Sequence, residues 1–290
     1  MTFACETLDR LRIAAEAAAY RAGSLVLKRY GQAIEIGSKG REQMAGDVVT
    51  VADSEAQKAI LDVLEGLDPA IGMLAEEEGQ DRNQSRFEKD CFWSIDPLDG
   101  TLPFIERSNG FAIAIALVSR EGEPLLGVAY LPAFGDLYSA IKGGPALKNG
   151  EPFHVEPVRG ALHFSTSAAD LLPPDRNQAI NRIVVALSAH DRVTKVAPVP
   201  HGGAVAKACW VLENAPAVYV CIPRAEGGAS LWDFAATACI AKAAGGWVSD
   251  MFGNAPELNR RESTFMHHKG VLYATDKELA RIVIESYAQR

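Results

Sequence analysis

The sequence has 290 residues, of which 48% are hydrophobic and 23% are charged, and its formal net charge is −8. These values are ordinary for a globular chain that is long enough to bury a large core. The negative charge argues against a nucleic-acid polymer as partner, because proteins that bind one normally present a basic face. A small phosphorylated metabolite is still possible as a ligand, since bound divalent metals can supply the positive charge that the chain lacks.

Two further features of the chain bear on its compartment. The sequence contains no run of roughly 18 or more apolar residues, the length that a membrane span requires, and its N-terminus lacks the basic flank and apolar block of a signal peptide. The five cysteines are scattered and form no C-x-x-C pair, which argues against a disulfide framework and against a structural zinc site. We therefore expect a cytoplasmic protein without a membrane segment.

The first predicted element is an amphipathic helix over residues 5–30, where apolar residues recur at helical spacing and Gly31 is the predicted C-terminal stop. Residues 32–47 are polar and contain glycine, so we interpret them as a loop. A second helix follows the segment Val49-Thr50-Val51-Ala52-Asp53, and Asp53 occupies the position expected of an N-cap. Capping alone would explain this aspartate.

A short buried strand is predicted over residues 71–75, and it runs directly into Glu76-Glu77-Glu78-Gly79. Consecutive glutamates usually form a solvated loop. These glutamates, however, leave the carboxyl end of a strand, which is where the sheets of α/β proteins tend to place ligand sites. Both interpretations stay open for them.

The stretch Asp96-Pro97-Leu98-Asp99-Gly100-Thr101 follows an apolar run over residues 91–95 that is typical of a buried strand. Pro97 is expected to stop strand pairing, and Gly100 permits a tight turn close to a ligand. Neighbouring carboxylates repel each other, and their burial is costly unless a hydrogen-bonded turn, a shared proton or a cation compensates. An aspartate turn that bonds only its own backbone explains this segment equally well.

The rest of the chain alternates strands and helices. Short connections between three strand-like runs predict antiparallel hairpins, so the first sheet is not purely parallel; these runs cover residues 111–118, 125–130 and 137–141. Further strands are predicted over residues 162–166, 195–198 and 217–221, and helices over residues 176–190 and 203–212. We divide the chain into an N-terminal α+β half, residues 1–155, and a C-terminal α/β half, residues 156–290.

The last informative segment begins at Ser230 and leads into an alanine-rich helix that ends at Gly245-Gly246. Ser230 and Asp233 fit a capping box with Asp in place of Glu, so a purely structural role accounts for Asp233. The same residue, in the first turn of a helix, is also well placed to project into a cleft between the two halves.

The acidic positions Glu76, Asp96, Asp99 and Asp233, with Asp53 similar in kind, can be considered as one set. Each has a structural explanation when taken alone. Together they offer hard oxygen ligands at the ends of strands and in turns, without paired His or Cys, which favours Mg²⁺ over zinc. Magnesium is typically bound by a few carboxylates, waters and substrate phosphate.

Four segments resemble motifs of the inositol monophosphatase superfamily and occur in its order between residues 48 and 246. Asp96-Pro97-Leu98-Asp99-Gly100-Thr101, with Trp93 before it and Phe104 after it, resembles the family signature. Glu76-Glu77 resembles a Gly-Glu-Glu segment in which Ala75 replaces the glycine, and Val49 to Asp53 is similar to Val-Thr-x-x-Asp. Trp232-Asp233-Phe234-Ala235-Ala236, ending in Ala244-Gly245-Gly246, resembles the C-terminal motif. One such motif would be weak evidence, but four in order are specific.

This resemblance implies a layered α-β-α-β-α sandwich of the inositol monophosphatase and fructose-1,6-bisphosphatase type. It also implies a Mg²⁺-dependent, lithium-sensitive phosphomonoesterase of small molecules, commonly a homodimer, with roughly two or three ions in each site. Carried over position by position, the metal ligands would be Glu76, Asp96, Asp99, Asp233 and the Leu98 carbonyl. Asp53, Thr101 and Glu77 would be catalytic, and Gly100, Thr101 and Lys207 would bind the substrate.

The substrate is less clearly indicated than the reaction. Leu102-Pro103-Phe104 matches neither the Thr-Asn-Phe of inositol monophosphatases nor the Lys-Glu-Phe of the nucleotide 3′-phosphatases, and the loop over residues 225–229 follows neither pattern. Gly203 and Lys207 are placed as in the nucleotide 3′-phosphatases. We predict an inositol monophosphatase-like enzyme, with a 3′(2′),5′-bisphosphate nucleotidase as the alternative. A non-catalytic module that binds a small ligand is the alternative of another class. Aspartyl-phosphate chemistry is disfavoured, because it requires Asp-x-Asp spacing.

Overall fold

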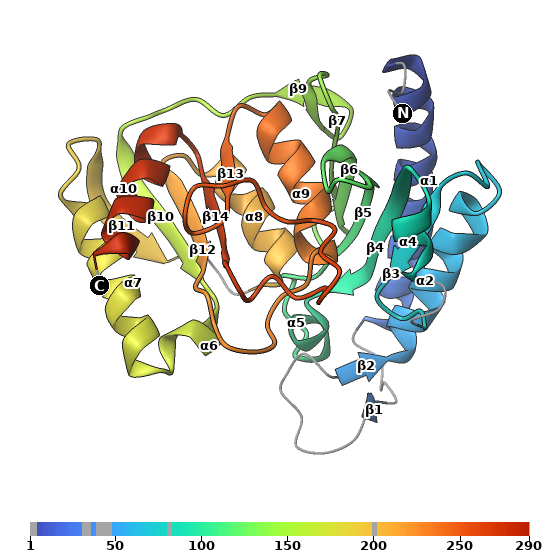
Figure 1. The fold of residues 1–290 in the computed structure, drawn as a ribbon, viewed down its shortest axis with the longest axis horizontal. Coiled ribbons are helices and arrows are strands. Elements are labelled where there is room, and N and C mark those ends of the chain that lie inside the picture. Colours follow the sequence, from blue (N-terminus) through green and yellow to red (C-terminus); the bar gives the residue numbers. More distant parts are fainter. Residues whose placement is uncertain (1–4, 31–35, 39–47, 80–82, 199–201, 290) are drawn as a thin grey trace.

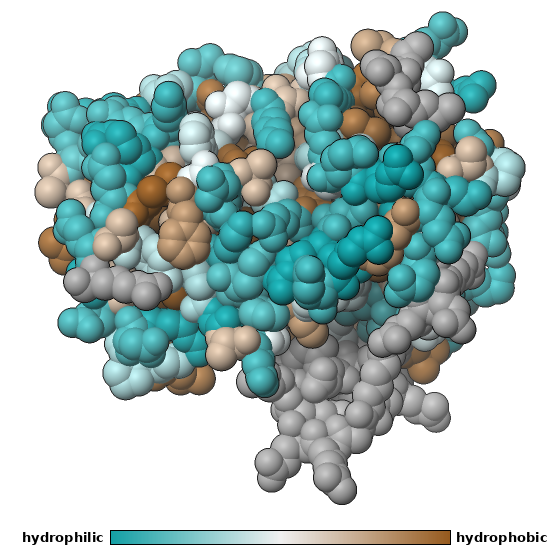
Figure 2. Space-filling model, in the orientation of Figure 1, coloured by the Kyte–Doolittle hydropathy of each residue, from teal (hydrophilic) through white to brown (hydrophobic). Residues whose placement is uncertain are grey.

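The computed structural model describes residues 5–30, 36–38, 48–79, 83–198 and 202–289. In Figure 1, the seven-stranded and the five-stranded β-sheets alternate with three layers of helices across the molecule. This arrangement confirms the predicted α-β-α-β-α sandwich. None of the helices within the described part of the chain is both long enough and apolar enough to cross a membrane. Hydrophilic residues dominate the face of the molecule that Figure 2 shows.

The first helical layer consists of α1 (Cys5–Arg29) and α2 (Val51–Leu64), which pack against each other and against one face of a seven-stranded sheet. The predicted amphipathic helix is therefore confirmed. Glu6 in its first turn, and Lys28 and Arg29 in its last turn, complement the helix dipole. Its buried face consists of small and aliphatic residues, among them Leu8, Leu11, Ala15, Ala18, Ala22 and Val26.

The seven-stranded sheet has the order β3-β4-β5-β6-β7-β8-β9. Its strands are β3 (Gly72–Ala75), β4 (Cys91–Asp99), β5 (Ala112–Ser119), β6 (Pro124–Leu131), β7 (Asp136–Ile141), β8 (Ala146–Lys148) and β9 (Glu151–Phe153). Only the β3–β4 pair is parallel, so the predicted antiparallel hairpins are confirmed. Short α4 (Ser85–Glu88) and α5 (Thr101–Ile105) flank β4 in the chain.

The middle helical layer, α8 (Ala204–Glu213) and α9 (Trp232–Ala243), lies between this sheet and a second sheet of five strands. The second sheet has the order β11-β10-β12-β14-β13; its strands are β10 (Gly160–Thr166), β11 (Val193–Pro198), β12 (Ala217–Cys221), β13 (Trp247–Ser249) and β14 (Val271–Ala274). The outer layer consists of α7 (Pro174–Ser188) and α10 (Lys277–Ala288), preceded by the short α6 (Ala168–Leu171).

Three clusters of buried side chains occupy the spaces between the layers. The middle cluster contains Leu74 and Phe92 of the first sheet together with Tyr219 and Tyr273 of the second sheet. The two halves of the chain therefore share one hydrophobic core around α8 and α9. The division at residues 155 and 156 separates the two sheets along the sequence, and as a domain boundary it stays a prediction.

The region between α1 and α2 differs in part from its prediction. Within the predicted loop over residues 32–47, residues 36–38 form β1 (Ile36–Ser38), which pairs antiparallel with β2 (Val48–Thr50). The loop prediction is wrong for these residues, because the pairing of a short, glycine-containing strand with its neighbour in the chain is not visible in local composition. The remainder of that loop, together with Gly31, lies outside the described residues.

Candidate metal centre

Asp96 and Asp99 both come from β4, and a β-bulge turns them toward the same side of the sheet. Asp96 is paired with Ala114 and Asp99 with Ala112, so three steps along β4 oppose two along β5. Side chains three residues apart on a regular strand point to opposite faces, and one extra residue brings them to the same face. The prediction that Pro97 stops strand pairing is wrong: the bulge accommodates the proline, and pairing resumes at Asp99.

Backbone N–H groups hold both carboxylates. Oδ1 of Asp96 accepts a hydrogen bond from the Leu98 N–H at 3.0 Å, which closes a turn within the bulge. Asp99 accepts from the N–H of Ala204 at 3.0 Å and from that of Val205 at 2.8 Å, at the beginning of α8. These bonds join β4 to α8, which lies more than 100 residues further along the chain.

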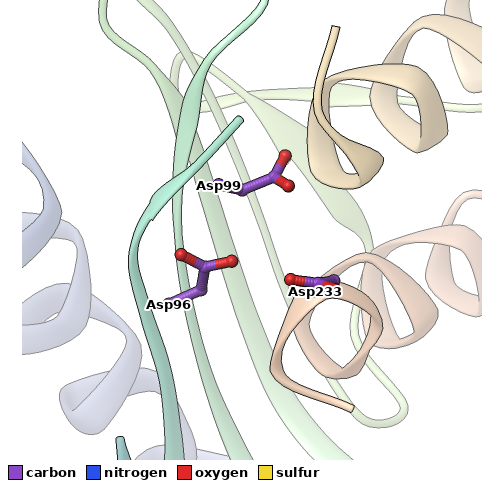
Figure 3. A group of neighbouring side chains, drawn as sticks. All are labelled: Asp96, Asp99 and Asp233. Carbon is purple, nitrogen blue, oxygen red and sulfur yellow. The ribbon is translucent and has the colours of Figure 1, made fainter. Parts of the chain in front are cut away.

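Asp233 enters the site from the first turn of α9. Its Oδ2 accepts a hydrogen bond from the Ser230 N–H at 2.6 Å, as the aspartate of a capping box would. The predicted box is only half formed, because the N-cap is Leu231 and no side chain caps the helix. In Figure 3, the carboxylates of Asp96 and Asp99 face the carboxylate of Asp233 across a common space. One ligand oxygen from each of the three residues lies within 4.8 Å of the others. The hydrogen bond supports the structural interpretation of Asp233, and its position beside Asp96 and Asp99 is compatible with the functional one, which stays a prediction.

Glu76 interacts electrostatically with this group but is not one of the three residues whose oxygens lie within 4.8 Å of one another. It follows β3 directly, and its backbone N–H donates to the Ile95 carbonyl of β4 at 3.2 Å. Its carboxyl group and that of Asp96 act on each other electrostatically, and the charges of Asp233 and Asp53 also act on it. The parallel pairing of β3 with β4 thus brings the glutamates that end one strand beside the aspartates that end the next.

Asp53 and Glu77 lie next to this group. Asp53 is buried and is the third residue of α2, so the prediction that it caps the helix is wrong; the helix begins two residues earlier, at Val51. The Glu77 N–H donates to Oε1 of Gln57 at 2.9 Å, which ties the segment after β3 to α2. The charges of Asp53 and Glu77 both act on Glu76.

The surroundings of these four carboxyl groups disfavour the charged form and raise their pKa values. Burial, followed by repulsion from Glu76, raises the pKa of Asp96 well above its usual range. Burial raises the pKa of Asp99 to about 7, although the N–H groups of Val205 and Ala204 oppose the shift. Burial raises the pKa of Asp233 to about 6. Burial is also the main cause that raises the pKa of Glu76.

Leu98, Gly100 and Thr101 form the turn that follows the bulge. The Thr101 hydroxyl donates to the Leu98 carbonyl at 3.2 Å. Gly100, at the N-cap of α5, has a φ of 81°, and a Cβ atom there would lie 2.9 Å from the Gly110 carbonyl oxygen. Only glycine satisfies both conditions at this position.

Lys207 lies on α8 with Nζ 5.8 Å from the centre of the Tyr219 ring. Its charge lowers the pKa of Asp99, yet the net shift of that group is upward. The positive charge of Lys207 therefore does not compensate the combined negative charge of the carboxylates. A divalent cation would do so, and a donor set of carboxylate oxygens is the kind that Mg²⁺ prefers. The residues present thus fit a magnesium site.

A buried ion-pair network supports the loop over residues 225–229, and the sequence analysis missed it. Asp170 accepts hydrogen bonds from Nη1 of Arg176 at 2.9 Å and from the Ile222 N–H at 3.2 Å, and it lies 3.3 Å from Nη2 of Arg224. A Cβ atom on Gly228 would lie 3.0 Å from Cζ of Arg224, so the loop folds back over this side chain. No spacing rule connects Asp170 with Ile222, which lies 52 residues further along the chain, or with Arg224 beyond it.

Known proteins are similar to the chain over most of its length. Residues 7–289 match the model of the Inositol monophosphatase family. The chain is 33% identical over 218 residues to the 3′(2′),5′-bisphosphate nucleotidase CysQ of Escherichia coli O6:H1, which covers 74% of this chain and 81% of that protein. It is 32% identical over 248 residues to the inositol-1-monophosphatase of Mesorhizobium japonicum, with coverage of 83% and 86%. The solved structure of an IMPase/NADP phosphatase complexed with Mg²⁺ and phosphate has the same fold, with a TM-score of 0.72 and 18% identity over 98% of this chain and 97% of that one.

Proposed function

Because the chain belongs to the inositol monophosphatase family, we propose that it is a Mg²⁺-dependent phosphomonoesterase that hydrolyses a small phosphorylated metabolite by attack of water. One observation carries the proposal: Asp96 and Asp99 of the first sheet meet Asp233 of the middle helical layer within 4.8 Å. Burial of carboxylates in such proximity is costly, and a cation bound between them relieves the cost.

In this proposal, the carboxylates of Glu76, Asp96, Asp99 and Asp233 and the Leu98 carbonyl hold the metal. When bound, Mg²⁺ lowers the pKa of a coordinated water and neutralises charge on the phosphoryl group. The hydrogen bonds from backbone N–H groups to Asp96 and Asp99 support this assignment, because they fix both carboxylates before an ion arrives. Phosphoryl transfer depends mainly on position and charge, so a rigid set of anchored ligands suits it.

The remaining site residues orient the attacking water, accept its proton and bind the phosphate group. Thr101 orients the attacking water; its hydroxyl hydrogen is engaged by the Leu98 carbonyl, which leaves the hydroxyl oxygen as an acceptor. Asp53 is the base that accepts the proton lost by the water, with Glu77 as the alternative base; a positioned base contributes about 10²- to 10⁴-fold in this role. The backbone N–H groups of Gly100 and Thr101, at the beginning of α5, bind phosphate oxygens.

For the substrate, we propose an inositol monophosphate, the class named for the relative from Mesorhizobium japonicum. A 3′(2′),5′-bisphosphate nucleotide is the second candidate. The observation that favours it is Lys207, because a cation this close to Asp99 would attract a second phosphate group. The relative from Escherichia coli is named for that activity.

The test is phosphate release from inositol 1-phosphate and from 3′-phosphoadenosine 5′-phosphate, each measured with Mg²⁺ and with a chelator. We expect release that requires Mg²⁺, with a higher kcat/KM for inositol 1-phosphate. A preference for the nucleotide would support the second candidate. Release from neither compound, nor from a wider panel of sugar phosphates, would contradict the proposal and favour a non-catalytic module that binds a small ligand.

We also propose that the protein is a homodimer and that Li⁺ inhibits it, as the family resemblance implies. Sedimentation velocity at several protein concentrations tests the first point. Titration of the Mg²⁺-dependent activity with Li⁺, with K⁺ at equal ionic strength as the control, tests the second.

A further inference from the structure

Gly127 lies in the middle of the first sheet, directly beneath α9. It belongs to β6, where it is paired with Ala116 of β5 and Ala140 of β7. A Cβ atom at this position would lie 2.2 Å from the carbonyl oxygen and 3.0 Å from Cα of Ala236. The backbone of the helix therefore touches the backbone of the strand, with no room for even one methyl group between them.

This contact lies one helical turn from Asp233. Residues that are three positions apart in an α-helix lie on the same face, so the face of α9 that rests on Gly127 is the face from which Asp233 reaches toward β4. Asp233 and Ala236 belong to one continuous helix, Trp232–Ala243. A displacement of the helix at Ala236 is transmitted to Asp233, because hydrogen-bonded helix turns move together.

We propose that Gly127 is a positioning residue that sets the height of α9 above the first sheet, and through it the distance from Asp233 to Asp96 and Asp99. The inference rests on the proposed function of these carboxylates as Mg²⁺ ligands. A methyl group on residue 127 would require a shift of about 1 Å to relieve the overlap. Metal–ligand distances tolerate deviations of only about 0.2 Å, so the site should respond strongly.

The experiment compares Gly127→Ala with Ala129→Gly by measuring melting temperature against Mg²⁺ concentration. Both positions lie on β6, two residues apart and hence on the same face, and Ala129 is buried in the middle core. Ala129→Gly loses a methyl group and destabilises the strand without raising the helix. We expect Gly127→Ala to raise the Mg²⁺ concentration at half-maximal stabilisation by about tenfold or more, the size of effect known for residues that orient metal ligands. Ala129→Gly should lower the melting temperature and leave that concentration nearly unchanged.

The possible outcomes separate this inference from the proposed function. If the wild-type protein does not respond to Mg²⁺, both proposals are overturned. If the wild type responds and Gly127→Ala responds at the same concentration, the role of Gly127 alone is overturned. An equal weakening in Ala129→Gly would show that general destabilisation is the cause, which also contradicts a positioning role.

Cys239 offers a second variant if Gly127→Ala does not fold. It lies one further turn along α9, is buried, and its Sγ is 3.8 Å from the Ala140 carbonyl oxygen of β7. Cys239→Leu enlarges this contact and raises the helix from the sheet, whereas Cys239→Ala creates space. The inference predicts weaker Mg²⁺ binding for Cys239→Leu only, and equal Mg²⁺ response in the two variants would overturn it.

Discussion

A Cβ atom on Gly203 would lie 2.1 Å from Oδ2 of Asp99, so the backbone that precedes α8 rests directly on this carboxylate. The contact lets the N–H groups of Ala204 and Val205 reach both oxygens of Asp99. The orientation of Asp99 toward Asp233 is therefore set by a glycine from the other half of the chain.

Gly203→Ala should damage the site and the fold together, because the added methyl group overlaps the Asp99 carboxylate. Overpacking of this kind typically costs about 1–3 kcal/mol of unfolding free energy. Urea denaturation measures the stability, and a Mg²⁺ titration of the melting temperature measures the site. Gly66→Ala is the control, because a Cβ atom there meets no atom within 4 Å. A fully stable Gly203→Ala protein with wild-type Mg²⁺ response would show that the contact is unimportant.

Asp96→Asn should abolish most activity while it preserves the fold. The amide oxygen of Asn can still accept the hydrogen bond from the Leu98 N–H, whereas the negative charge is lost. We expect a decrease in kcat of about 10²-fold or more. In the presence of a chelator the variant should be at least as stable as the wild type, since repulsion among the buried carboxylates falls.

The comparison is made by calorimetry with EDTA and by phosphate release with Mg²⁺. Parallel losses of stability and activity in Asp96→Asn would point instead to a structural aspartate.

Without metal, the protein should lose stability as the pH rises from about 4 to about 7. Asp99 and Asp233 have folded-state pKa values of about 7 and about 6, above the usual 3.8, so the folded protein binds their protons more tightly than the unfolded chain does. The stabilisation is fully present below the usual pKa and disappears as the pH passes the folded-state values. Denaturation in EDTA at pH 5 and pH 8 measures it.

Two comparisons make this pH dependence specific. Asp233→Asn removes one titrating group and should flatten the decrease of stability with pH. Added Mg²⁺ should stabilise the wild type more at pH 8 than at pH 5, because the ion binds deprotonated carboxylates. A wild-type stability in EDTA that rises between pH 5 and pH 8, with the same slope in Asp233→Asn, would contradict the raised pKa values.

Lys207→Ala should discriminate between the two substrate candidates. If Lys207 contacts a second phosphate group, its removal raises KM for 3′-phosphoadenosine 5′-phosphate by about tenfold and changes KM for inositol 1-phosphate little, since a hydrogen bond to a charged group contributes about 1.5–3 kcal/mol. Steady-state kinetics on both compounds measure the effect. Lys242→Ala, on α9, serves as a control for the loss of one lysine charge. Equal changes for both substrates would indicate that Lys207 acts on Asp99 rather than on the substrate.

From the sequence alone we predicted most elements of secondary structure, and we singled out the acidic residues that the structure brings together. Helical spacing predicted α1, and short turns predicted the antiparallel strands β5, β6 and β7. These features depend on residues close together in the chain, so periodicity and turn chemistry are sufficient to detect them.

Only the tertiary structure decided how the site is assembled. The bulge at Pro97 depends on the register between β4 and β5, and the orientation of Asp99 depends on the approach of Gly203. The approach of Asp233 to Asp96 depends on the packing of α9 against Gly127. The physical reason is the same in each case: the contacts join backbone segments that are distant in sequence, and close packing fixes them to a fraction of an ångström, which no local pattern of residues encodes.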